Sequence, residues 1–111
     1  MRKGLGKADI QPILDKLRAG LEAIYGPRLK QVLLFGSYAR GEAEDGSDID
    51  VAIVLEGLDN VPAERDRTGD LSYELSFDND LVIQTIFLQP RDVERPGQPL
   101  HMNIQREGVP A

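Results

Sequence analysis

The sequence predicts a small fold of the α/β (α+β) class, in which helices pack against a sheet of three or four strands. Helix-like and strand-like hydrophobic patterns alternate along the chain, and 111 residues suffice for one core. Apolar residues make up 41% of the chain, although only 5% of its residues are aromatic. We therefore expect a single domain over residues 1–111 with one modest core.

The first half of the chain predicts two helices and two strands. Residues 9–25 carry apolar side chains at the spacing of one helical face, and Gly26, followed by proline, ends that helix. The run 31–35 is nearly all apolar, which is typical of a strand buried on both faces. Small, polar and charged residues over 37–47 fit a short helix and a loop. Residues 48–55 alternate at first and then become continuously apolar, which predicts a second strand.

The second half predicts a helix, a strand and a short helical tail. Residues 62–77 begin with proline, which suits the first turn of a helix. A weak apolar stripe runs along this helix through Leu71, Tyr73 and Leu75. The β-branched content of 81–88 predicts a third strand. Four prolines in the remaining tail leave room for short helical turns, which we expect over 91–95 and 99–106.

Charge and composition exclude several classes of function. The net charge is −6, and the acids are concentrated in residues 41–80, which carry −11. This excess disfavours direct nucleic-acid binding and binding to anionic membranes. The chain has no cysteine, and its one histidine, His101, cannot form a His-rich metal site, so we expect a surface or packing role for it. No apolar run reaches a membrane span and residues 1–4 do not resemble a signal peptide, so we expect a cytoplasmic protein.

The strongest functional signal is a pair of short motifs at the ends of predicted strands. Gly36 lets the backbone turn sharply after the first strand, and Ser37 opens a helix whose N–H groups favour a phosphate. Arg40 lies one turn further, available to that phosphate or to nearby carboxylates. Asp48 and Asp50 share one face of the second strand. Two carboxylates this close favour a hard cation such as Mg²⁺ between them.

Each motif alone has an ordinary structural explanation, as a turn or as a solvated loop end. Together they place a phosphate cradle beside a carboxylate-held Mg²⁺, which is the equipment for phosphoryl or nucleotidyl transfer. Tyr38 either packs in the core or lines the rim of this site, and its place in the first helical turn favours the rim. We interpret Glu42, Glu44 and Asp45 as solvated loop acids.

The run from Phe35-Gly36-Ser37 to Asp48-Ile49-Asp50-Val51 resembles the signature of the DNA polymerase beta-type nucleotidyltransferase superfamily. The length of the chain and its Gln105-Arg106-Glu107-Gly108-Val109 ending are similar to the minimal nucleotidyltransferases. This resemblance covers almost the whole chain and implies a single nucleotidyltransferase domain with a mixed sheet and flanking helices. It also implies that Gly36 and Ser37 bind the triphosphate of a nucleotide, and that the catalytic pair Asp48 and Asp50 holds two Mg²⁺.

The same resemblance implies a reaction and a partner. The reaction is the Mg²⁺-dependent transfer of a nucleoside monophosphate from ATP or another nucleoside triphosphate to an acceptor hydroxyl. Minimal nucleotidyltransferases are commonly paired with a small helical HEPN-type protein in a toxin–antitoxin system. There the nucleotidyltransferase acts as the antitoxin, in some cases by adenylylating the toxin. A homo-oligomer is a second possible assembly of this chain.

One position departs from the family pattern. Alignment of the third strand puts Gln84 where the family has an Asp or Glu that completes the metal site and can act as a base. A neutral amide can neither neutralise Mg²⁺ nor usefully accept a proton. Asp80 would need a register shift of four residues, about 13 Å along a strand. A second hypothesis is therefore a nucleotide-binding antitoxin or complex subunit with little or no transferase activity.

Overall fold

The computed structural model describes residues 4–111, and its elements follow the predicted order. The helices are α1 (Gln11–Tyr25), α2 (Ser37–Arg40), α3 (Val61–Asp78), α4 (Pro90–Glu94) and α5 (Pro99–Glu107). The strands are β1 (Leu29–Phe35), β2 (Ile49–Leu55), β3 (Ile83–Leu88) and β4 (Val109–Pro110). Short 3₁₀ turns over Lys7–Ile10 and Gly26–Arg28 flank α1. Most of the segment 1–4, used above to judge a signal peptide, lies outside the described residues.

The strands form one mixed sheet in the order β3-β2-β1-β4, which confirms the predicted fold class. β2 and β3 are parallel, whereas β1 runs antiparallel to both β2 and β4. The two-residue strand β4 pairs with the second half of β1 and had no pattern of its own in the sequence. β3 begins at Ile83, later than the expected 81, because the chain is still turning out of α3 at Asp80, whose φ is +51°.

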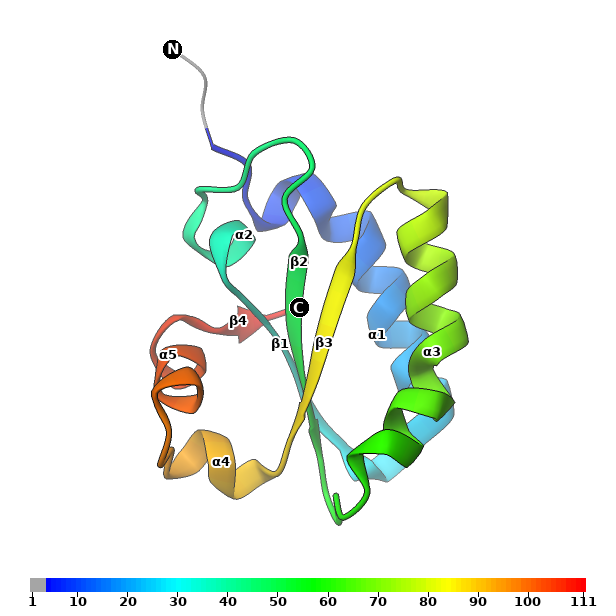
Figure 1. Ribbon diagram of the computed structural model, residues 1–111, viewed down its shortest axis with the longest axis vertical. Helices are drawn as coiled ribbons and strands as arrows, with labels where there is room; N and C mark the ends of the chain where they lie inside the picture. The colour runs from blue at the N-terminus through cyan, green and yellow to red at the C-terminus, as the bar shows by residue number, and fades with distance from the viewer. Residues whose placement is uncertain (1–3) are drawn as a thin grey trace.

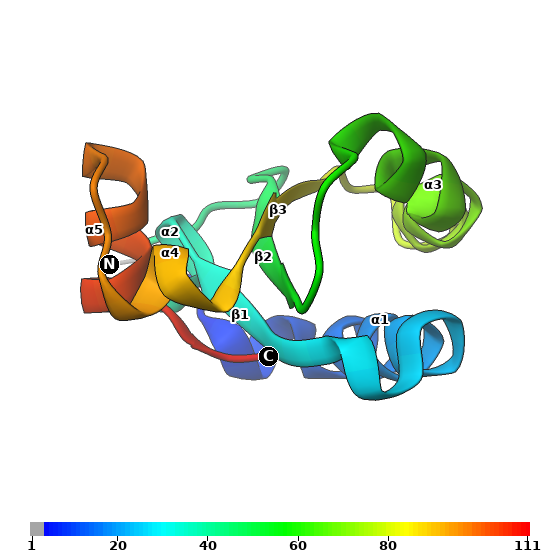
Figure 2. The same ribbon diagram turned by 90° about the horizontal axis from the view of Figure 1, so that it is seen from below.

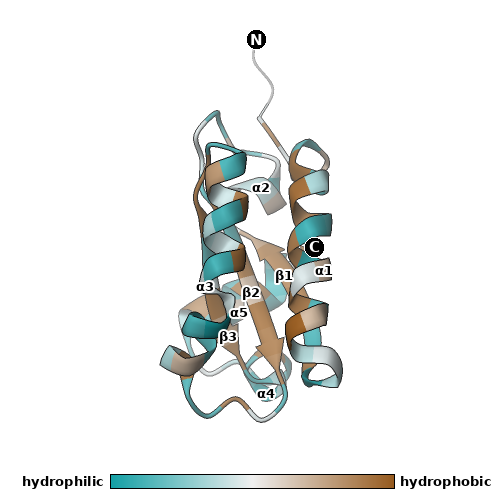
Figure 3. Cartoon of the chain, turned by 90° about the vertical axis from the view of Figure 1, so that its right-hand side faces the viewer, coloured by the Kyte–Doolittle hydropathy of each residue, from teal (hydrophilic) through white to brown (hydrophobic). Residues whose placement is uncertain are grey.

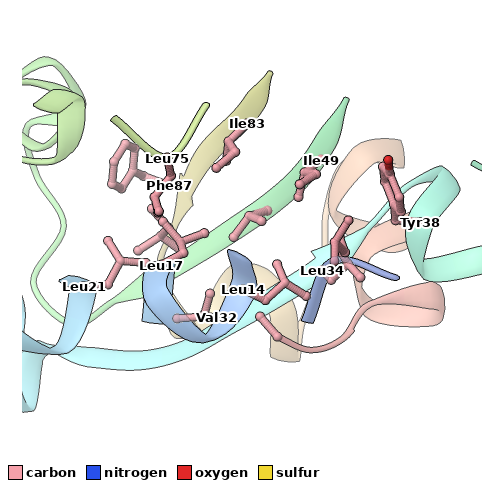
Figure 4. Packing of buried hydrophobic residues seen from close by; sticks show 14 of the residues in the cluster. Leu14, Leu17, Leu21, Val32, Leu34, Tyr38, Ile49, Leu75, Ile83 and Phe87 are labelled. Atoms are coloured by element: carbon pink, nitrogen blue, oxygen red, sulfur yellow. The ribbon is translucent and has the colours of Figure 1, made fainter. Parts of the chain in front are cut away.

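Helices cover both faces of this sheet, with α1 and α3 on one side and α4 and α5 on the other (Figures 1 and 2). Alternate strand residues point to opposite faces, so the apolar strands contribute to two buried clusters. In the larger cluster, Leu14, Leu17 and Leu21 of α1 are fully buried against the strands (Figure 4). The smaller cluster lies on the α4 and α5 side, around Leu33 and Ile104. The apolar colouring of β1 and β2 in Figure 3 reflects this burial on both faces.

α3 presents a largely polar surface (Figure 3) and touches the core along a narrow line. Leu75 is buried, and Leu71 packs where Gly20 leaves room, since a Cβ at position 20 would lie 2.7 Å from both Leu71 methyl carbons. The expectation that Tyr73 belongs to this line was wrong. Residues two apart lie about 200° apart around a helix, and Tyr73 is 70% exposed and stacks on Phe77 at the surface.

A buried carboxylate joins the turn after α1 to the start of α3. Glu64 accepts hydrogen bonds from the Tyr25 hydroxyl at 3.1 Å and from Arg28 Nη2 at 2.9 Å, and Arg67 Nε lies 3.1 Å from its Oε1. Burial alone would raise the pKa of Glu64, but the hydrogen bonds from Arg28 and Tyr25 and the two positive charges lower it overall. Burial and the contact with Glu64 raise the pKa of Tyr25 to about 12.

The segments that carry the functional motifs meet at one end of the sheet (Figure 1). β1 ends there and turns into α2, while β2 and β3 both begin there. In the strand register, Phe35 pairs with Asp50, and Asp50 pairs with Gln84. The Gly-Ser turn, the aspartate pair and Gln84 therefore lie on neighbouring strands.

Candidate functional site

Gly36 forms the turn between β1 and α2, and its backbone conformation requires glycine. Its φ is +77° and its ψ is −156°, a region that residues with a Cβ rarely adopt. A Cβ at this position would overlap Oδ2 of Asp50 and lie 3.2 Å from its carboxyl carbon. The backbone that follows β1 thus passes directly against the Asp50 carboxylate. Ser37 comes next as the first residue of α2 and is partly exposed.

Asp48 and Asp50 lie on the same side of the start of β2, as their spacing predicts. Ile49 between them is fully buried in the larger cluster, under α1 and α3. Alternation therefore directs both carboxylates toward the opposite face of the sheet. Both aspartates are partly exposed, and β2 begins at Ile49, one residue later than expected.

The environment of Asp50 opposes its ionisation. Burial is the largest effect that raises the pKa of Asp50, and the negative charge of Asp48 raises it further. The positive charge of Arg40 acts in the opposite direction. A cation beside the two carboxylates would relieve the same repulsion, because opposite charge favours the ionised form.

Arg40 is held over this end of the sheet by two carboxylates. Its Nε lies 2.6 Å from Glu42 Oε1, and its Nη1 lies 3.1 Å from Glu107 Oε1. Glu42 is an exposed acid, as expected, and in addition it forms an ion pair with Arg40. Glu107 was not recognised from the sequence, because it lies 67 residues from Arg40 on α5 and no local pattern connects them. Glu44 and Asp45 are exposed, as expected.

Gln84 reaches into the aspartate pair from the adjacent strand. It is the register neighbour of Asp50 on β3, and its Nε2 donates a hydrogen bond to Asp48 Oδ2 at 2.9 Å. Asp80 lies in the turn before β3, four residues ahead of Gln84 along the chain. Position 84, and not position 80, thus faces the aspartates from the third strand, as the alignment of apolar residues indicated.

Two other residues that the sequence analysis considered, Tyr38 and His101, do not contact the aspartate pair in the structure. Tyr38 is only 2% exposed and packs in the larger cluster (Figure 4), so the rim position favoured above was wrong. The buried strand next to α2 supplies apolar contacts that the first helical turn alone does not reveal. His101 is half-buried on α5 and lines a shallow groove between α4 and α5.

Within residues 4–111, no three His, Cys, Asp or Glu side chains gather closely enough to hold a metal ion on their own. The two aspartates offer hard oxygen ligands that suit Mg²⁺, but the cation would need further oxygen ligands from water or phosphate.

Among residues 4–111, no helix combines the length and the apolar character needed to span a membrane.

The family model described as "Nucleotidyltransferase domain" matches residues 14–103. Two relatives come from Methanocaldococcus jannaschii, and both are named as candidate protein adenylyltransferases. MJ1305 is 32% identical over 82 residues, which cover 73% of this chain and 56% of the relative. MJ0141 is 30% identical over 78 residues, which cover 70% of this chain and 78% of the relative. The chain thus spans little more than half the length of the first relative.

Three solved structures share the fold at sequence identities below 25%. A candidate minimal nucleotidyltransferase superposes with a TM-score of 0.64 at 20% identity, over 96% of this chain and 97% of that chain. A chain from a toxin–antitoxin structure with AMP-PNP superposes with a TM-score of 0.62 at 23% identity. The match covers 87% of this chain and 70% of that chain. A chain from the structure of a tri-AMPylated HEPN toxin of Shewanella oneidensis in complex with an MNT antitoxin superposes with a TM-score of 0.51 at 21% identity. The match covers 90% of this chain and 69% of that chain.

Proposed function

Because the chain belongs to the nucleotidyltransferase domain family, we propose that it transfers a nucleoside monophosphate from ATP or another nucleoside triphosphate to an acceptor hydroxyl, with Mg²⁺ as the required cation. The family agrees with the one identified from the Gly-Ser and Asp-x-Asp motifs. One observation carries the proposal: the Gly36 turn packs directly against Asp50, beside Asp48. A triphosphate at that turn would lie next to both carboxylates.

The donor set fits a hard divalent cation. Asp48 and Asp50 supply carboxylate oxygens on one side of β2, and both are partly exposed, so water and phosphate oxygens can complete the coordination. When bound, Mg²⁺ would neutralise phosphate charge and help to orient the triphosphate. The aspartates would hold it, and the repulsion that raises the pKa of Asp50 would then be relieved.

The remaining residues would position the nucleotide. The Gly36 turn brings the start of α2 beside the Asp50 carboxylate, and the Ser37 hydroxyl and the N–H groups of the first helical turn are donors for phosphate oxygens. Arg40 adds positive charge nearby. In the transfer, the acceptor oxygen bonds to the α-phosphorus, the bond from that phosphorus to the β-phosphate oxygen breaks, and pyrophosphate leaves. The hydroxyl proton passes to a base or to water.

We further propose that the acceptor belongs to a partner protein of the HEPN type. The complex from Shewanella oneidensis pairs an MNT antitoxin with a tri-AMPylated HEPN toxin, and the M. jannaschii relatives are named as candidate protein adenylyltransferases. A protein acceptor suits this chain, since its described residues form one small sheet with covering helices.

The contact between Gln84 and Asp48 supports a second candidate function. A neutral amide at the third position removes a charge from the site, which favours a nucleotide-binding antitoxin or subunit with little transferase activity. The two candidates predict different outcomes for label transfer.

The test uses ATP labelled at the α-phosphate, Mg²⁺ and, as the acceptor, the protein encoded by the neighbouring gene. We expect label on the partner protein with the wild type and none with the Asp48→Ala/Asp50→Ala variant. The control is Asp59→Ala, which removes an exposed acid from the loop between β2 and α3. Nucleotide binding without label transfer would favour the second candidate, and equal labelling by the double variant would refute the site.

A further inference from the structure

Gln84 occupies the position that would complete the carboxylate set, and it engages one of the two aspartates. It faces the same side of the sheet as Asp50, because the residues on either side of it, Ile83 and Thr85, alternate to the other face. Its side-chain N–H group donates to Asp48 Oδ2 at 2.9 Å. An N–H group directed at a carboxylate oxygen competes with a cation for that oxygen.

The other charges around the pair are already compensated or lie elsewhere in the fold. Glu42 and Glu107 both pair with Arg40, so neither carboxylate is held for a cation. Arg40 itself is held at this end of the sheet by those two ion pairs. Asp80 belongs to the turn before β3. Within residues 4–111, no third carboxylate thus gathers with Asp48 and Asp50, and the side chain that contacts Asp48 from β3 is an amide.

From this arrangement we propose that the site holds one divalent cation with the nucleotide, not two, and that Gln84 sets this number. The inference rests on the proposed function, since it concerns the cation that accompanies the nucleotide. Two cations about 4 Å apart repel strongly and need bridging negative charge. Asp48 and Asp50 provide two negative charges, and the side chain that reaches them from β3 is a neutral hydrogen-bond donor.

The same arrangement has a consequence for the acceptor. An amide at position 84 cannot take the proton of the acceptor hydroxyl. Position 84 therefore offers no base for that proton, which agrees with a base supplied together with an acceptor on a second protein.

Counting bound cations tests the inference without relying on activity. The probe is Mn²⁺ with an ATP analogue that carries a methylene group between the α- and β-phosphates and cannot be transferred. Equilibrium dialysis then gives Mn²⁺ per protein-bound nucleotide. We expect about one for the wild type and a rise toward about two for Gln84→Asp, which restores the third carboxylate. The matched control, Gln31→Asp, makes the same change at an exposed position of β1 and should stay at about one.

The outcomes separate this inference from the proposed function. About two Mn²⁺ per nucleotide in the wild type, or no increase in Gln84→Asp, would overturn the inference. If the Gln84 carbonyl is itself a ligand, the wild type will bind about two and Gln84→Ala about one, which also overturns it. The Asp48→Asn/Asp50→Asn variant tests the proposed function separately, because retention of cation-dependent nucleotide binding in that variant would refute the site as a whole.

Discussion

Replacement of Gly36 by alanine is the sharpest perturbation that the structure offers, since one methyl group affects both the backbone and Asp50. A φ of +77° with a ψ of −156° is a region occupied almost only by glycine, and a residue with a Cβ there costs about 1–3 kcal/mol. The new methyl group would also overlap Asp50 Oδ2 and displace that side chain from its rotamer, at a cost of about 0.5–1.5 kcal/mol. We expect Gly36→Ala to lower the free energy of unfolding by about 2–4 kcal/mol.

Thermal unfolding and nucleotide binding report the two parts of this effect. The melting temperature should fall by about 10 °C, and Mg²⁺-dependent nucleotide affinity should fall by about tenfold or more because Asp50 is displaced. In an Asp50→Ala background, Gly36→Ala should cost less, by about 0.5–1.5 kcal/mol, since the overlapping carboxylate is gone.

Gly69→Ala is the matched control. An added Cβ at position 69 of α3 meets nothing within 4 Å, so the same substitution should stabilise the helix by about 0.5–1 kcal/mol. A Gly36→Ala protein with the melting temperature and nucleotide affinity of the wild type would refute the reasoning about this turn.

Three further predictions concern the core and the buried carboxylate. Leu17→Ala should lower the free energy of unfolding by about 2–5 kcal/mol in urea titrations, since Leu17 is fully buried; an unchanged midpoint would contradict its place in the core. Because the pKa of Glu64 is lowered on folding, its contribution is present above the unfolded pKa of about 4.3 and is lost as the pH falls through the folded value. Glu64→Gln should therefore cost about 1–3 kcal/mol at neutral pH, a figure reduced for the partial exposure of the arginines, and this cost should shrink in urea titrations near pH 3; a cost independent of pH would contradict the assignment. The pKa of Tyr25 is raised to about 12, so its phenol stabilises the fold below the unfolded pKa of about 10 and this contribution is lost as the pH rises toward 12. The tyrosinate absorbance that Tyr25→Phe removes should appear near pH 12, and its appearance near pH 10 in the folded protein would argue against burial.

Most elements could be predicted from the sequence because their signals are local. The spacing of apolar residues in α1 and the apolar runs of β1 and β2 depend on neighbours in the chain. β4 could not be recognised, since a two-residue strand exists only through pairing with β1. Tyr73 was assigned to the wrong face because the weak stripe of α3 gives no firm helical phase.

The residues of the candidate site likewise divide into those that local sequence patterns predict and those whose place depends on contacts between distant segments. Gly36, Asp48 and Asp50 belong to short motifs that can be recognised in the sequence. The position of Gln84 followed from aligning the apolar run of the third strand with the family pattern, and the strand register agrees with it. The partners of Arg40 could not be predicted, because the contact with Glu107 depends on how α5 folds back over β1. Tyr38 shows the reverse error, since a residue at the start of a site helix was judged without the strand that buries it.

The dependence of nucleotide affinity on Mg²⁺ tests the central claim most directly. Binding of the α,β-methylene ATP analogue is measured with and without Mg²⁺ for the wild type, for Asp48→Asn/Asp50→Asn and for the Asp59→Asn control. We predict that Mg²⁺ strengthens binding about tenfold or more in the wild type and the control, and has little effect in the double variant, whose side chains keep their size but lose their charge. An equal response to Mg²⁺ in all three proteins would contradict the claim that these two aspartates hold the cation for the nucleotide.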